Sequence, residues 1–189
     1  NYPANQNIVH LLIINCSYMV TETKVKEEVL CEIDATVFKY LNIMLTLGER
    51  RINSIPFKDS WTPGQLFNHV TKSTNGMAHV MAVPATPAHR DPGIRIAELK
   101  ETFLDFSIKM ESPESIVPDK GPYEIESTIA DLAHAFQAFK ENVNAADLEE
   151  LVEGLPLGPI TKLELLYFVQ YHTQRHLHQL EKIEAALNI

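Results

Sequence analysis

The chain has 189 residues, of which 45% are hydrophobic, and a formal net charge of −9. This length suits one well-buried domain and is short for two. The acidic balance argues against nucleic acid and anionic membranes as partners, because phosphate groups require a basic patch. No apolar run approaches the ~20 residues that span a bilayer, and Cys16 and Cys31 fit no metal or redox spacing. We therefore expect small molecules or a second copy of the chain as partners, no membrane association, and a cytoplasmic location.

The first 18 residues differ from the rest of the chain. NYPANQNIVHLLIINCSY contains no Asp, Glu, Lys or Arg, and it lacks the basic start and small-residue cleavage site of a signal peptide. Charged, helix-like sequence begins at Met19. We interpret residues 1–18 as a non-native or N-terminal extension and residues 19–189 as the domain. The alternative is a genuine N-terminal strand or arm that packs on the body or on a neighbouring subunit.

Helical spacing of apolar residues predicts a long first helix over residues 23–51. Its inward positions are Val25, Val29, Ile33, Val37, Leu41, Met44 and Leu47. A second helix is predicted over residues 62–81. It has Thr62 as N-cap, Pro63 at the first helical position and Gln65 as the return half of a capping box.

A proline-punctuated loop then separates the second helix from a third amphipathic helix, predicted over residues 94–110. Its inward positions are Ile96, Leu99, Phe103 and Phe106. A fourth helix follows another loop and runs to about residue 142, with Ser127 or Thr128 as its cap. Its apolar stripe is formed by Ile129, Leu132, Phe136 and Phe139.

The last helix is predicted to begin at a second capping box, formed by Thr161 and Glu164, and to end near Leu187. The chain shows no convincing pair of strands. Four or five helices with ordinary loops indicate an all-α protein, an antiparallel four-helix bundle with short accessory helices.

Three histidines carry the functional interpretation. His172 and His176 lie one turn apart in the last helix, so their rings share one face, and that face continues the apolar stripe. His69 lies on the inward face of the second helix. Buried imidazoles require partners for their ring nitrogens, and a shared divalent metal satisfies all three. The alternative is core histidines satisfied by carbonyl or carboxylate groups. Three neutral imidazoles leave coordination positions open, which is typical of a catalytic metal site.

Other polar residues give weaker indications. Gln179 lies on the same helix face as the histidine pair and could bond an imidazole N–H or a substrate, although a surface amide explains it equally well. Gln65 lies one turn before His69, and its capping role competes with a role beside the metal. No carboxylate is placed to act as general base, so the catalytic residues stay unknown. The remaining histidines lack ligand-like partners: His10, His79, His89, His134 and His178.

Two short motifs, in this order behind a long first helix, resemble those of the DinB/YfiT-like superfamily. The motifs are Trp61-Thr62-Pro63 with His69, and His172-Thr173 with His176 and Gln179. The match covers roughly residues 24–187. The resemblance implies an up-down-down-up four-helix bundle, frequently a homodimer, with a three-histidine site for a divalent ion such as zinc or nickel. Members with assigned activities include thiol-dependent S-transferases, thiol-dependent isomerases and metal-dependent hydrolases.

The leading hypothesis is therefore a metal-dependent transferase or hydrolase. Its three histidines would hold the ion, which activates a low-molecular-weight thiol or water for S-transfer to, or hydrolysis of, a small molecule. Substrate contacts are expected from the loops around residues 84–92 and 111–126. The alternative is a non-catalytic metal-binding bundle that acts as a binding or interaction protein. The sequence does not choose between thiol transfer and hydrolysis.

Overall fold

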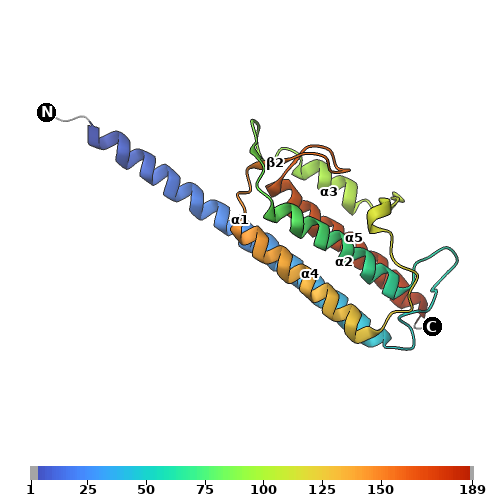
Figure 1. Ribbon diagram of the computed structural model, residues 1–189. Helices are drawn as coiled ribbons and strands as arrows, with labels where there is room; N and C mark the ends of the chain where they lie inside the picture. Colours follow the sequence, from blue (N-terminus) through green and yellow to red (C-terminus); the bar gives the residue numbers. More distant parts are fainter. Residues whose placement is uncertain (1–3, 188–189) are drawn as a thin grey trace.

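The structure, a computed structural model, describes residues 4–187, with side chains from residue 23 onward. Its elements, in chain order, are α1 (Ala4–Leu47), α2 (Pro63–Ala82), β1 (Thr86–Pro87), α3 (Ile96–Leu104), η1 (Glu114–Ile116), α4 (Ile125–Ala145), β2 (Glu150–Val152), β3 (Ile160–Thr161) and α5 (Lys162–Leu187). Helices α1, α2, α4 and α5 form a four-helix bundle, and the short α3 packs against α5 (Figure 1). The predicted bundle with accessory helices is confirmed.

The bundle helices run in two opposed pairs. Helices α1 and α5 lie in contact and run in one direction, whereas α2 and α4 lie in contact and run in the other (Figure 1). This is the up-down-down-up order. Two parallel neighbours cannot be joined by a tight turn, so residues 83–124 return along the length of the bundle and carry β1, α3 and η1. This long crossover contributes to the candidate site below.

Helix α1 is longer than predicted at its start and shorter at its end. It begins at Ala4, and its first turns extend beyond the bundle (Figure 1). It stops at Leu47 because Gly48 adopts a left-handed φ of 67° and donates its N–H to the Met44 carbonyl at 3.0 Å. Residues 4–18 are helical, so they form no strand. The extension hypothesis stays a prediction, and its residues 1–3 lie outside the described residues.

Both predicted capping boxes are confirmed. At the start of α2, the Gln65 N–H donates to the Thr62 hydroxyl at 3.2 Å, and the Thr62 N–H donates to the Gln65 amide oxygen at 3.0 Å. At the start of α5, the Glu164 N–H donates to the Thr161 hydroxyl at 3.1 Å, and the Thr161 N–H donates to the Glu164 carboxylate at 3.0 Å. These reciprocal bonds fix where the two histidine-bearing helices begin.

Helix α3 ends at Leu104, several residues before the predicted end at Met110. The Asp105 carboxylate accepts hydrogen bonds from the N–H and the hydroxyl of Ser107, at 2.9 and 2.6 Å. Such local side-chain bonds compete with helix continuation. Phe106 consequently leaves the inward face and is 42% exposed, so its predicted burial is wrong.

The predicted cap of α4 is also wrong. The helix begins at Ile125, ahead of Ser127 and Thr128, and its N-cap Glu124 makes no side-chain capping bond. The Glu49 carboxylate instead accepts the Ile125 N–H at 3.1 Å. A distant residue thus serves the helix start, which local sequence cannot reveal.

The structure adds a small sheet that the sequence did not predict. Strands β1, β2 and β3 pair antiparallel in that order, with Thr86 opposite Leu151 and Val152 opposite Ile160. Strands of two or three residues are too short to show an alternating pattern. The sheet joins the chain just after α2 to the chain just before α5.

Among the residues with described side chains, one hydrophobic core runs through the bundle. Its largest fully buried apolar and aromatic side chains include Tyr40, Phe67, Phe139, Ile33, Met44, Leu66 and Leu132. Among residues 4–187, no helix combines the length and the apolar character needed to cross a membrane.

Candidate metal centre

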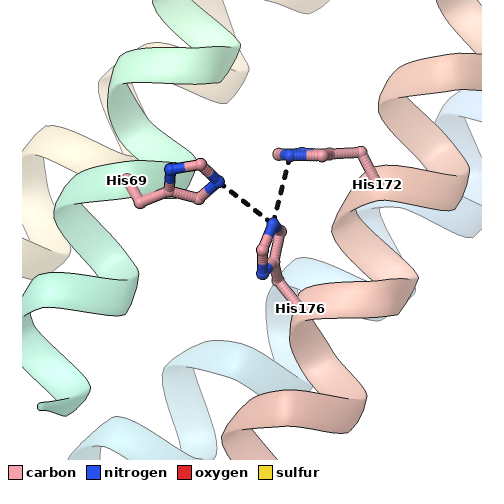
Figure 2. Close-up of side chains that lie close together, drawn as sticks. All are labelled: His69, His172 and His176. Carbon is pink, nitrogen blue, oxygen red and sulfur yellow. Dashed lines mark hydrogen bonds between the residues drawn. The ribbon is translucent and has the colours of Figure 1, made fainter. Parts of the chain in front are cut away.

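The structure brings together three histidines that are distant in sequence. His69 lies in the second turn of α2, and His172 and His176 lie one turn apart on α5, with all three rings converging (Figure 2). The Nε2 atom of His176 lies 3.1 Å from the Nε2 atom of His69 and 3.1 Å from that of His172. One potential ligand atom from each ring lies within 4.8 Å of the others.

The cluster is enclosed by aromatic side chains. His69 is 2% exposed, and His172 and His176 are each 8% exposed. The Trp61 ring lies 4.9 Å from the His69 ring, and the Phe168 ring lies 5.3 Å from the His172 ring, measured between centroids. These walls exclude water and lower the local dielectric constant, so every charge inside the cluster acts strongly.

Burial keeps the three imidazoles neutral. It lowers the pKa of His69, against an opposing hydrogen bond to the Ile116 carbonyl. Burial, helped by the charges of His176, His69 and Arg175, lowers the pKa of His172 well below its ordinary value. Burial likewise lowers the pKa of His176 to about 3. Neutral imidazoles have the protonation state that metal ligation requires.

Hydrogen bonds fix which nitrogen of two rings carries the proton. His69 Nδ1 lies 2.8 Å from the Ile116 carbonyl oxygen, and His176 Nδ1 lies 3.0 Å from the Gln179 amide oxygen. Because both oxygens only accept, each Nδ1 is the donor. Each neutral ring therefore presents a lone pair at Nε2. These two lone pairs face each other at 3.1 Å, and no proton is available between them.

This arrangement fits a metal better than it fits a self-contained hydrogen-bond network. His172 can donate one proton to His176, but His69 Nε2 then keeps a buried lone pair without a donor, which is costly. The alternative of core histidines satisfied by carbonyls accounts for only one nitrogen of His69. Two tetrahedral zinc ligands at about 2.05 Å from the ion lie ~3.3 Å apart. The separations of 3.1 Å from the His176 Nε2 atom to the other two Nε2 atoms are close to that value, and all three ligand atoms lie within 4.8 Å of one another.

The structure also places the other residues that the sequence singled out. Gln179 bonds His176, as described, whereas Gln65 uses its amide oxygen in the capping box. Thr173 of the second motif donates its hydroxyl to the Val169 carbonyl in its own helix at 2.6 Å. His178 faces away from the cluster and stacks on Phe106, with ring centroids 4.1 Å apart.

Sequence reasoning missed two contributors. The Ile116 carbonyl belongs to the crossover, and a backbone group leaves no trace in a residue pattern. Arg175 lies beside His176 in sequence and donates to the carbonyls of Phe103, Asp105 and Ile108, which anchors the end of α3 over the cluster. Of the two loops expected to contact substrate, residues 111–126 reach His69 through Ile116. The loop over residues 84–92 reaches the start of α5, where Arg90 pairs with Glu164.

Fold and cluster together define a four-helix-bundle protein with a three-histidine centre that could hold a metal ion. The family model of the DinB superfamily matches residues 34–180, and the chain belongs to this superfamily. The chain is also similar to the crystal structure of TT2238, a four-helix bundle protein, with a TM-score of 0.55 and 18% identity over 82% of this chain and 98% of that chain. At this identity the likeness concerns the fold alone. No curated protein matches the sequence.

Proposed function

We propose that the protein is a metal-dependent enzyme in which His69, His172 and His176 hold one divalent ion, zinc or nickel, and in which a small-molecule thiol is the nucleophile for S-transfer. The observation that carries this proposal is the convergence of three Nε2 atoms, two of them with lone pairs fixed by bonds at the opposite nitrogen. When bound, a divalent ion supplies Lewis acidity, which lowers the pKa of a thiol or water at its open position towards neutrality.

The surrounding charges favour a thiol over water. With the imidazoles neutral, the charged group that shifts the pKa values of His172 and His176 is Arg175, and among the described residues no carboxylate shifts the pKa of any of the three imidazoles. A nearby cation stabilises a thiolate. A free thiol also ionises near pH 8.5, far more readily than water. Hydrolysis, the other activity considered from the sequence, normally relies on a nearby proton acceptor.

The protein's own residues would keep the centre in shape. Gln179 and the Ile116 carbonyl orient two rings, and the aromatic walls formed by Trp61, Phe103 and Phe168 exclude bulk water. Partners outside the chain belong to the same proposal: a small electrophilic substrate, a low-molecular-weight thiol and a second copy of the chain as a homodimer. Light scattering of the purified protein measures the oligomeric state.

Cobalt substitution tests the thiol proposal directly. The cobalt-loaded protein should show a ligand-field absorption spectrum, and adding a small thiol such as 2-mercaptoethanol should produce a sulfur-to-metal charge-transfer band. His172→Ala should show neither feature, and a glycol of similar size without sulfur serves as the control. A thiol that leaves the cobalt spectrum unchanged contradicts the proposal.

A second candidate function is a non-catalytic metal-binding bundle. The burial of the three clustered histidines favours it, since none of these three residues is more than 8% exposed and a substrate must reach a covered centre. In that case the cobalt spectrum would be tetrahedral but insensitive to thiols. Such a protein would also show no turnover when a panel of electrophiles is offered with several cellular thiols.

A further inference from the structure

One polar face of α2 binds the crossover beside the metal centre. The His69 Nδ1–H donates to the Ile116 carbonyl at 2.8 Å, and one turn later the Lys72 ammonium donates to the Val117 carbonyl at 3.0 Å. Lys72 also pairs with the Asp119 carboxylate at 2.9 Å, and the Asp119 N–H donates to the Asn68 amide oxygen at 3.0 Å. Three side chains of α2 thus bind three crossover residues within the four-residue stretch 116–119: Ile116, Val117 and Asp119.

The bond from Lys72 to a carbonyl differs from an ordinary surface ion pair. The Asp119 carboxylate is 69% exposed and the Lys72 side chain 31% exposed, so their pair alone contributes about 0–1 kcal/mol of stability. The Val117 carbonyl, in contrast, belongs to the peptide unit that directly follows the Ile116 carbonyl. A group that fixes one of these carbonyls restricts the other, because two backbone dihedrals separate them.

The Ile116 carbonyl is in a sensitive position. It ends η1 (Glu114–Ile116), a single 3-10 turn with no buried residue, so its own packing holds it weakly. On its other side the next strong anchor is Arg175, which reaches no further along the crossover than Ile108. The bonds from α2, together with the packing of the buried Pro118 that follows, therefore keep this carbonyl opposite His69.

We propose that Lys72 is a positioning residue of the metal centre, which holds the crossover so that the Ile116 carbonyl binds His69 Nδ1–H and the His69 Nε2 lone pair faces His176. The proposal rests on the proposed function, because only in that function does this lone pair bind a metal ion. Without the ammonium group, the carbonyl can leave His69, and the ring is then free to place its proton on either nitrogen. Loss of such a supporting bond typically lowers metal affinity roughly 10- to 100-fold.

The test compares Lys72→Met with Lys72→Arg, which keeps a cationic donor, and with Lys100→Met, which makes the same change on the exposed face of α3. Asp119→Ala removes the ion pair but keeps the bond to the Val117 carbonyl. Nitrogen-15 NMR of the histidine rings in the metal-free protein reports the His69 tautomer, and zinc competition with a chromophoric chelator reports affinity. Thermal unfolding checks that each variant is folded.

Lys72→Met should mix the two His69 tautomers and weaken zinc binding roughly 10- to 100-fold. Lys72→Arg, Lys100→Met and Asp119→Ala should resemble the wild type in both measurements. An unchanged His69 tautomer or an unchanged zinc affinity in folded Lys72→Met overturns the proposal, and an Asp119→Ala variant with the full defect assigns the effect to the ion pair instead. If the wild type binds no zinc, the proposed function fails, while the tautomer measurement still decides what Lys72 does.

Discussion

Acid should destabilise the metal-free protein through its buried histidines, and the lowered pKa of His176 allows the size of this effect to be calculated. In the unfolded chain the pKa of this imidazole is near its ordinary 6.5, whereas burial lowers it to about 3 in the fold. Between these values the unfolded chain binds a proton that the folded chain excludes. The stability that comes from this difference is complete above pH 6.5 and is lost progressively as the pH falls below it.

The size of the effect follows from the gap between the two pKa values. At pH 5.0 the pH is about 1.5 units below the pKa of this imidazole in the unfolded chain, and each unit is worth about 1.36 kcal/mol. Protonation of His176 in the unfolded chain alone therefore lowers the free energy of unfolding by about 2 kcal/mol. The lowered pKa values of His69 and His172 act in the same direction. A domain with 5–15 kcal/mol of total stability would show this clearly.

Urea unfolding of the chelator-treated protein, followed by circular dichroism at pH 7.0 and pH 5.0, measures the loss. The wild type should lose about 2 kcal/mol more than His176→Gln between these pH values, because carboxylate titration is common to both proteins and cancels. His134→Gln, which removes an exposed imidazole on α4, should follow the wild type. Equal losses in the wild type and in His176→Gln would refute the reasoning that burial keeps this ring unprotonated.

Zinc should bind the wild type at one ion per chain. It should be lost on dialysis from His172→Ala, because that variant retains only two of the three imidazoles. An unchanged zinc content of this variant by elemental analysis would show that these histidines are not the ligands. Gln179→Leu should lower zinc affinity roughly 10- to 100-fold because the His176 ring loses its acceptor, whereas Gln174→Leu on the same helix should not. Calorimetric titration with zinc compares the affinities of the two variants, and equal affinities would show that Gln179 does not support the metal centre. Chelation should lower the melting temperature without unfolding the bundle, since saturation at 100 times the dissociation constant adds only about 2.7 kcal/mol. Loss of the helical circular dichroism signal on chelation would contradict this.

The fold was predictable where the signals are local and repeated. Apolar spacing and the two capping boxes located the four bundle helices, because each signal involves residues within a few positions of one another. The errors arose where a few local bonds or a distant partner decide the outcome. Asp105 ends α3 through its own side chain, Glu49 serves the start of α4 from another loop, and the strands are too short for a pattern.

For the candidate site, the sequence identified the three histidines that the structure brings together, since side chains one turn apart on a buried stripe must share a face. It also placed Gln179 on that face, where it bonds His176. The sequence could not identify the groups that hold these histidines and the crossover in position. The Ile116 carbonyl is a backbone atom, and Lys72 and Arg175 act on carbonyls whose positions depend on the path of the crossover.

The separation of the three histidines along the chain sets the order in which the centre can be assembled during protein synthesis. His69 and His176 are 107 positions apart, and both α5 histidines follow every other element of the bundle. Chains emerge from the ribosome from the N-terminus, so a nascent chain lacks two of the three imidazoles until its last described helix has been made. An ion held by all three histidines could therefore bind only after α5 has been synthesised, and it could not guide any packing of the earlier helices that takes place before that point.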